Sequence, residues 1–209
     1  MRSIIVVREL EKGDLPPAVG VVARGMRDNP LHIAALGTDA GLREHRLTSL
    51  FAIALPLIFS KGAVLGAFDG DTLAGIAGMI APGNCQPSLT EKLTVMPRLM
   101  PAVGGGALAR VSRWMSAWTH HDLPEPHWHL GPVAVDAHLQ RNGIGTLLMT
   151  EYCARLDRVH ATGYLETDKP SNVTFYERFG FETIGSAPVL ETANWFMKRS
   201  ARSTSAGTD

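Results

Sequence analysis

A glycine-containing loop between an apolar strand and an apolar helix has the residue types best suited to chemistry. From strand end to helix start, its residues are Val133, Ala134 and Val135, then Gln140, Arg141, Asn142, Gly143, Ile144, Gly145 and Thr146. Glycine lets successive backbone N–H groups approach an anion without interference from a Cβ atom. The first turn of the helix adds unpaired N–H donors and a partial positive charge. The pattern therefore predicts a site for a pyrophosphate group.

Two familiar phosphate motifs do not match this loop. A Walker loop requires Gly-Lys-Ser/Thr, which is missing, and a dinucleotide fingerprint requires a third glycine where Leu148 stands. Glu166 does follow at roughly the ~20-residue spacing of a ribose-binding acid, so a dinucleotide site stays open as an alternative. A plain strand-to-helix turn without a ligand is the structural alternative, because a pair of glycines is weak evidence by itself.

A second motif follows the loop on an expected short helix. Asn172 and Tyr176 are four residues apart, so they share one face of that helix. Phe175 and Phe179 share another face, which we expect to pack in the core. Gly180 suits the left-handed residue after a helix end. The spacing therefore predicts that Tyr176 points away from the phenylalanines and into a cleft.

Taken together, the two motifs resemble the GNAT superfamily of N-acetyltransferases. The shared pattern is Gln-x-x-Gly-x-Gly followed by Asn-x-x-x-Tyr-x-x-x-Gly-Phe, and the match covers residues 124–184. Ala137 stands where the family often has proline, and Arg141 stands where a small residue is common. Neither change removes a donor, because the anion is held by main-chain N–H groups.

The resemblance implies acetyl-CoA as the co-substrate and a role for each part of the motifs. Residues 133–135 would pair with the pantetheine arm, and an N–H group there would stabilise the thioester oxyanion, a donor whose loss typically costs ~3 kcal/mol. Residues 140–146 would hold the pyrophosphate. Asn172 would contact the coenzyme or fix the active-site helix.

Acetyl transfer to an amine requires two proton movements. An alkyl ammonium with a pKa of ~10 must lose a proton before it can attack, and the departing CoA thiolate must gain one. By resemblance Tyr176 is the general acid, and Glu166 is the candidate base, directly or through water. His129 is the alternative base. The competing interpretations are a packing role for Tyr176 and a structural role for Glu166.

Four histidines raise the question of a metal site. His127 and His129 share one face of an expected strand, after His120 and His121 on the preceding segment. No carboxylate or cysteine completes a recognisable ligand spacing with them, so we expect no metal. The two cysteines, Cys85 and Cys153, are expected to be free thiols.

Composition favours a small molecule as the partner, and we expect the protein to be cytoplasmic. Lysine plus arginine equals aspartate plus glutamate, at 20 each, so nothing indicates a nucleic acid or an anionic membrane as partner. The longest apolar stretch, residues 50–59, contains Pro56 and is too short to span a bilayer, and the N-terminus has too short an apolar run for a signal peptide.

The leading function is therefore acetylation of a small-molecule amine. Acetylation of a protein or peptide and a non-catalytic acyl-CoA-binding module are the alternatives. The sequence leaves the acceptor, the acyl chain length and assembly as a monomer or homodimer open.

The elements that position these residues predict an α/β fold. We expect one GNAT-like domain over residues 1–199, with a central mixed sheet of six or seven strands, helices on its flanks and two splayed parallel strands that form the coenzyme cleft; residues 200–209 are expected to be a disordered tail. Strands are expected at residues 4–10, 63–68, 72–81, 128–135, 164–167, 181–184 and 195–198. Helices are expected at residues 14–26, 38–61, 90–96, 107–120, 143–159 and 171–179. Gly75 and Gly78 indicate a close approach of backbone or ligand, or tight packing.

Overall fold

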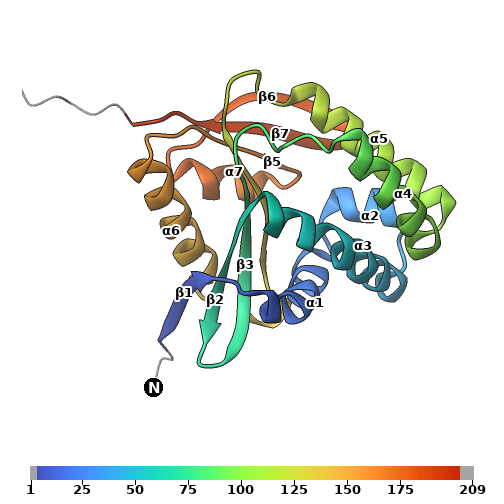
Figure 1. Cartoon of the computed structure of the whole chain (residues 1–209), viewed down its shortest axis with the longest axis horizontal. Coiled ribbons are helices and arrows are strands. Elements are labelled where there is room, and N and C mark those ends of the chain that lie inside the picture. The colour runs from blue at the N-terminus through green and yellow to red at the C-terminus, as the bar shows by residue number, and fades with distance from the viewer. Residues whose placement is uncertain (1–3, 203–209) are drawn as a thin grey trace, which may run out of the picture.

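A computed structural model describes residues 4–202 and contains one seven-stranded sheet with helices on both sides (Figure 1). The strands are β1 (Ile5–Glu9), β2 (Gly62–Asp69), β3 (Thr72–Ile80), β4 (Trp128–Val135), β5 (Gly163–Thr167), β6 (Glu182–Val189) and β7 (Thr192–Arg199). The helices are α1 (Leu15–Met26), α2 (Pro30–Leu36), α3 (Ala40–Lys61), α4 (Leu89–Val103), α5 (Gly105–His121), α6 (Ile144–Arg158) and α7 (Pro170–Glu177). Of the expected tail, residues 203–209 lie outside the described part.

The sheet is mixed and has the strand order β1-β2-β3-β4-β5-β7-β6. Every neighbouring pair is antiparallel except β4 and β5, which run parallel. Those two strands pair only at Trp128 with Gly163 and at His129 with Tyr164. Beyond these residues β4 keeps its partner β3 but no longer pairs with β5. The predicted mixed sheet with splayed parallel strands is therefore confirmed.

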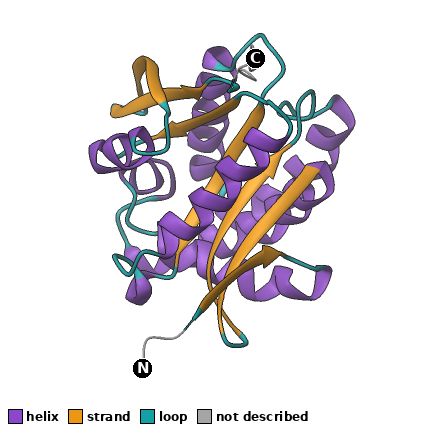
Figure 2. Cartoon of the chain, turned by 90° about the vertical axis from the view of Figure 1, so that its left-hand side faces the viewer, coloured by secondary structure: helices purple, strands orange, loops and turns teal. Residues whose placement is uncertain are grey.

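The two faces of the sheet carry separate apolar cores. Successive residues of β2 show the alternation: Val64 packs with α1, α3 and α5, whereas Leu65 packs with α6. Leu148 and Tyr152 of α6 are fully buried on the second face. Figure 2, which views the molecule from the α6 side, shows this helix crossing the strands, with most of the other helices behind them. Both faces of the central strands are thus closed to solvent.

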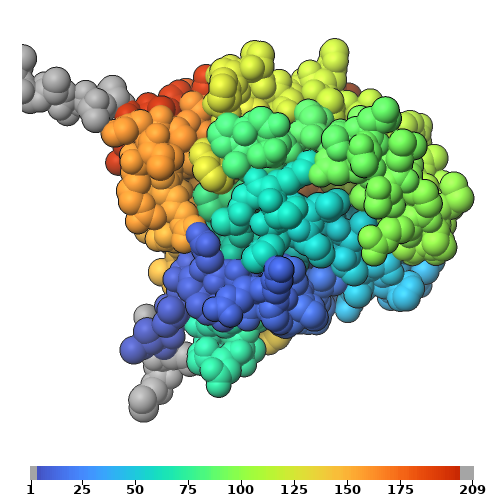
Figure 3. Space-filling view, in the orientation of Figure 1, coloured from blue at the N-terminus to red at the C-terminus, as the bar shows by residue number. Residues whose placement is uncertain are grey.

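The segment between β3 and β4 is more helical than the sequence predicts. The expected helix of residues 90–96 is the first half of α4, which continues to Val103. Ser88 and Glu91 form a reciprocal cap at its start, and Pro97 and Pro101 lie four apart on its exposed side. Figure 3 shows this segment, coloured green, lying against α3 on the surface. Packing against α3 and α5 therefore maintains a helix that two prolines would otherwise interrupt.

The last two strands are also longer than expected. β6 and β7 are joined by Leu190 and Glu191, which have φ angles of 49° and 63°. Such a turn normally uses glycine or asparagine, and neither is present here to mark the hairpin in the sequence. None of the helices found within residues 4–202 combines the length and the apolar character needed to cross a membrane.

Candidate active site

The glycine loop lies where the sequence places it, between β4 and α6. Gly143 caps the helix with a φ of 83°, in the left-handed region that glycine tolerates, and Arg141 has a φ of 67°. The N–H groups of Ile144, Gly145 and Thr146 stand in the first helical turn, where no carbonyl of the same helix can accept from them. Gly143 and Thr146 are exposed. The helix start thus offers donors and positive potential to an anion at the surface.

Side chains of the loop are used to hold it in place. Gln140 donates from Nε2 to the backbone oxygens of Gly25, at 3.1 Å, and Val135, at 3.2 Å. Asn142 donates to the backbone oxygen of Leu139 at 3.2 Å. The side chains of Gln140 and Asn142 are therefore engaged within the protein and hold the loop main chain in place.

An ion pair that the sequence does not reveal fixes the other end of the loop. Arg24, on the last turn of α1, donates from Nε and Nη2 to Asp136 Oδ2 at 2.9 and 2.6 Å. Only 5% of the Asp136 side chain is exposed, and the hydrogen bonds from Arg24 lower its pKa although burial alone would raise it. Because Asp136 directly follows β4, the pair joins α1 to the point where the loop begins.

Two glycines of β3 allow close packing behind the loop. A Cβ atom on Gly75 would lie 3.0 Å from Ala134 O and 3.1 Å from Ile144 Cγ2. A Cβ atom on Gly78 would lie 2.6 Å from Gly131 O. The close approach predicted at both positions is confirmed. The backbone of β4 approaches both glycines, and the first residue of α6 also approaches Gly75. Beyond His129, the edge of β4 that faces β5, including Val133 to Val135, has no strand partner within residues 4–202.

Glu166 and His129 form a buried pair at the point where β4 and β5 part. His129 Nε2 lies 2.8 Å from Glu166 Oε2; 18% of the His129 side chain and 2% of the Glu166 side chain are exposed. Burial alone would lower the pKa of His129, but the negative charge of Glu166 and contact with Cys85 raise it to about 10. Glu166 Oε1 and His129 Nδ1 are buried and have no hydrogen-bond partner among the described residues. The structure therefore joins the two candidate bases and leaves one polar atom of each unpaired.

Tyr176 lies in the core, and the prediction that it points away from the phenylalanines is wrong. It is the one buried residue of α7, and its ring contacts Phe175 at 5.2 Å and Phe181 at 6.0 Å between centroids. Phe175 and Phe179 are only half-buried and contact each other at 5.3 Å. The short helix packs against β5 and β6 through the tyrosine face, which reverses the expected orientation.

The Tyr176 hydroxyl nevertheless keeps the properties of an acid. It makes no hydrogen bond within residues 4–202, and burial raises the pKa of the phenol further above its ordinary value of ~10. The group therefore carries its proton at neutral pH. Asn172 donates from Nδ2 to Thr167 Oγ1 at 3.1 Å, which ties α7 to the end of β5 and fits the helix-fixing role.

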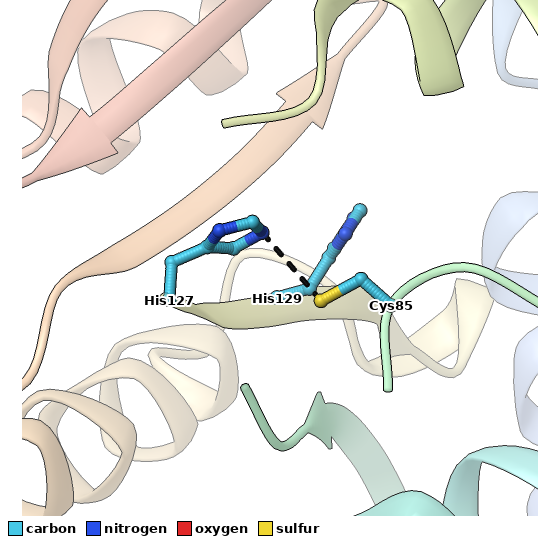
Figure 4. Close-up of side chains that lie close together, drawn as sticks. All are labelled: Cys85, His127 and His129. Carbon is cyan, nitrogen blue, oxygen red and sulfur yellow. Dashed lines mark hydrogen bonds between the residues drawn. The ribbon is translucent and has the colours of Figure 1, made fainter. Parts of the chain in front are cut away.

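Metal-binding side chains that no sequence spacing connects lie close together in the structure. Cys85, from the loop of residues 81–88, places its Sγ 3.5 Å from His127 Nε2 (Figure 4). Asp122 Oδ1 lies 3.0 Å from the same nitrogen. A cysteine and a carboxylate thus do accompany the histidines. The sequence could not indicate this, because the cysteine lies 42 positions away.

Helix α5 covers the face of the sheet that carries Glu166. Phe196 is the cross-strand partner of Glu166, and His121 stacks on Phe196 at 4.1 Å. Tyr164 donates to His121 O at 2.9 Å. Trp114 is buried and Trp118 packs against it at 5.0 Å, so the two tryptophans belong to the core beneath α5.

The family model of GNAT acetyltransferases matches residues 43–181. The chain therefore belongs to the GNAT acetyltransferase family. It is an acetyl-CoA-dependent acetyltransferase of this type.

Solved structures share the fold along almost the whole chain. One is a histone acetyltransferase HPA2 and related acetyltransferase from Corynebacterium glutamicum, with a TM-score of 0.75 and 20% identity over 98% of this chain and 100% of that one. Another is an agmatine N-acetyltransferase variant in its apo form, with a TM-score of 0.61 and 15% identity over 94% and 99% of the two chains. A third is a GNAT acetyltransferase from Brucella melitensis in complex with acetyl-CoA, with a TM-score of 0.54 and 17% identity over 95% and 89%. At these identities the likeness shows the fold.

Proposed function

We propose that the protein acetylates the amine of a small molecule, with Glu166 and His129 acting together as the base and Tyr176 as the acid. The observation that carries the proposal is the buried His129–Glu166 contact of 2.8 Å at the parting of β4 and β5. The coenzyme supplies an acetyl thioester, which the amine attacks directly. What the protein must add is an anion site, an acceptor for the ammonium proton and a donor for the thiolate.

The residues fit the coenzyme on three separate counts. The edge of β4 beyond His129, which does not pair with β5, offers main-chain groups to the pantetheine arm, and Val133 to Val135 are its last residues. The start of α6 offers the N–H groups of residues 144–146 to the pyrophosphate. The exposed glycine at its cap leaves this position free of side-chain atoms, because a Cβ on Gly143 would meet nothing within 4 Å.

The pair of Glu166 and His129 can take the ammonium proton in one step. In the neutral form of His129, which its raised pKa makes the minor form at neutral pH, Nε2 donates to Glu166 and the unpaired Nδ1 carries the lone pair. The carboxylate then orients the ring and stabilises the imidazolium that forms, as an acidic partner does in catalytic triads. Glu166 is thus a positioning residue for His129. Its own unpaired oxygen, Oε1, is a second place where the amine can be held.

Tyr176 supplies the second proton movement. Its phenol stays protonated because burial raises its pKa, and it has no protein acceptor among the described residues to compete for its proton. A thiolate that leaves the tetrahedral intermediate can accept that proton. Packing by Phe175 and Phe181 keeps the ring in one orientation.

A small acceptor is favoured over a protein because the proposed base is buried. Only 2% of the Glu166 side chain is exposed, and the end of α5 closes the face above it through the contact between His121 and Phe196. A narrow primary amine can enter such a site more readily than a folded polypeptide. Residues 125–128, 165–167 and 175–178 are also similar to the corresponding stretches of puromycin N-acetyltransferase, which favours the same class without identifying puromycin as the substrate.

A panel of acceptors tests the proposal. Release of CoA from acetyl-CoA would be followed with agmatine and other small primary amines, and with lysine-containing and N-terminally free peptides at equal concentration. We expect kcat/KM to be highest for a small amine. Higher values for the peptides would favour the alternative of a protein acetyltransferase, and CoA release with none of them would support a non-catalytic acyl-CoA-binding module.

A further inference from the structure

Three metal-binding side chains converge on one point beside the candidate active site. Cys85, His127 and His129 each offer one ligand atom, and these atoms all lie within 4.8 Å of one another. They come from two separate segments, because the cysteine belongs to the loop after β3 and the histidines to the start of β4. Figure 4 shows the thiol directed towards the two imidazole rings. His127 is buried, and the other two residues are half-buried.

The hydrogen bond made by His127 fixes which of its nitrogens faces the cluster. Its Nδ1 lies 2.9 Å from the backbone oxygen of Glu125, and since a carbonyl can only accept, Nδ1 carries a proton. Nε2 is then the nitrogen that faces Cys85 Sγ, at 3.5 Å, and Asp122 Oδ1, at 3.0 Å. Metal-binding histidines usually make this kind of bond from the nitrogen that does not bind the metal.

The distances suit a tetrahedral cation. Bond lengths of ~2.3 Å to sulfur and ~2.0 Å to nitrogen place a thiolate and an imidazole nitrogen about 3.5 Å apart around one zinc ion. The separation of Cys85 Sγ and His127 Nε2 is 3.5 Å. The three ligand atoms all lie within 4.8 Å of one another, so the longer separations must shorten by side-chain rotation when an ion binds.

Neighbouring residues hold the ligands and add negative charge. The ring of Tyr164 packs edge-on against His127 at 5.3 Å and His129 at 5.4 Å. Glu166 fixes His129 through Nε2, which leaves Nδ1 as the buried nitrogen without a partner among the described residues. Asp122 brings a carboxylate next to His127, and its other oxygen accepts from Gln86 at 2.6 Å. The ligands are therefore oriented by contacts of their own, as in sites built for a metal.

We propose that Cys85, His127 and His129 bind a Zn²⁺ ion, with the fourth position left to solvent. One thiolate and two imidazoles suit zinc in both charge and softness. On binding, the Cys85 thiol and the protonated ring nitrogens that face the ion, including His127 Nε2, release their protons to solvent, and the sulfur and the two nitrogens form the bonds to the metal. The site stands on geometry alone and does not depend on which amine is acetylated.

Direct metal titration tests the proposal without any activity measurement. Chelator-treated protein without an affinity tag would be titrated with Zn²⁺ against a chromophoric chelator, and with Co²⁺ while the absorption spectrum is recorded. We expect one equivalent to bind, with a near-ultraviolet thiolate-to-Co²⁺ charge-transfer band and the visible bands of tetrahedral cobalt. Cys85→Ala should remove the band and weaken Zn²⁺ binding by about 100-fold or more. Loss of a residue that only hydrogen-bonds to a metal ligand typically weakens metal binding ~10–100-fold.

Cys153→Ala is the matched control, because it removes the other free cysteine, which lies in α6. It should keep both the charge-transfer band and the Zn²⁺ affinity. His127→Gln should weaken binding as Cys85→Ala does. A wild-type protein that binds no Zn²⁺ or Co²⁺ at micromolar concentration would overturn the proposal, as would Cys85→Ala binding that matches wild type.

A measurement on the wild-type chain covers the case in which Cys85→Ala fails to fold. Alkylation of Cys85 would be followed by mass spectrometry of peptides, with and without one equivalent of Zn²⁺. We expect the ion to slow alkylation of Cys85 at least about 10-fold and to leave Cys153 unaffected. Equal alkylation rates in the presence of a bound equivalent of Zn²⁺ would place the ion elsewhere and overturn the assignment.

Discussion

His129 Nε2 lies 2.8 Å from Glu166 Oε2, across the gap that opens between β4 and β5. The contact joins the last paired residue of β4 to the strand next to it, so it sits at the inner end of the coenzyme cleft expected for this family. The same histidine belongs to the group of Cys85, His127 and His129. The proposed base and the proposed metal site therefore share one side chain.

Replacing Glu166 tests the base. Glu166→Gln should lower kcat/KM most at pH values below the amine's own pKa of ~10, where the ammonium form dominates and must lose its proton on the enzyme. As the pH rises towards ~10, neutral amine becomes abundant and the deficit should shrink. Rates of variant and wild type would be compared from pH 6.5 to 10, in buffers that contain a chelator. A ratio that stays constant over this range would contradict a role for Glu166 in proton removal.

The strand and helix that carry the glycine loop could be predicted from the sequence, because interactions between residues close in sequence determine where they begin and end. β4 begins and ends at the expected residues, and α6 starts one residue after the expected position at Gly143, where a positive φ needs glycine. Helix α2 was missed for the opposite reason. The Leu31 N–H group at the start of α2 donates to Asp168 Oδ2 at 2.7 Å. This capping residue lies 137 positions away in the sequence, so the sequence near α2 does not show it.

The difference between contacts that are close in sequence and contacts that are remote in sequence also explains the errors within the site. The pairing of Arg24 with Asp136 and the approach of Cys85 to His127 join segments remote in sequence, so no spacing could indicate them. The orientation of Tyr176 depended on which face of a two-turn helix meets the sheet. Periodicity cannot decide this when aromatic residues occupy both faces.

Gly143 tests the anion site. Gly143→Val should weaken acetyl-CoA binding at least about 10-fold, since its side chain would extend from the exposed helix cap where the pyrophosphate is expected, and the left-handed backbone would be strained as well. Calorimetric titration with acetyl-CoA measures the effect. Gly70→Val is the matched control, because Gly70 also has a positive φ and free space around it but lies in the β2–β3 turn. A Gly143→Val protein that is folded and binds with wild-type affinity would refute the site.

Zinc should inhibit acetyl transfer if both proposals hold. A His129 nitrogen that binds the metal cannot accept a proton from the amine, so Zn²⁺ should reduce kcat and a chelator should restore it. Cys85→Ala should need at least about 10-fold more Zn²⁺ for the same inhibition, whereas Cys153→Ala should respond as wild type does. Titrations of activity with Zn²⁺ check this. Equal sensitivity of Cys85→Ala and wild type would place the inhibitory ion at another position.

Tyr176 gives the sharpest test of the mechanism, because its hydroxyl and its ring have separable roles. The ring packs against Phe175 and Phe181, while the hydroxyl bonds to nothing in the described part of the chain. Tyr176→Phe keeps the ring, so the melting temperature and the affinity for acetyl-CoA should stay close to wild type. Loss of the acid should lower kcat by ~10²-fold, which corresponds to ~2.7 kcal/mol in the barrier.

The matched control for that variant is Tyr152→Phe. Tyr152 is also fully buried, but its hydroxyl donates to Trp128 O at 3.1 Å, so its loss should cost about 1 kcal/mol of stability. Melting curves and turnover measured on the same preparations should therefore separate the two tyrosines. Tyr152→Phe should melt at a lower temperature and keep its turnover per folded molecule, and Tyr176→Phe should do the reverse. If Tyr176→Phe melts early and turns over normally, the residue serves packing alone and the thiolate must take its proton from another group.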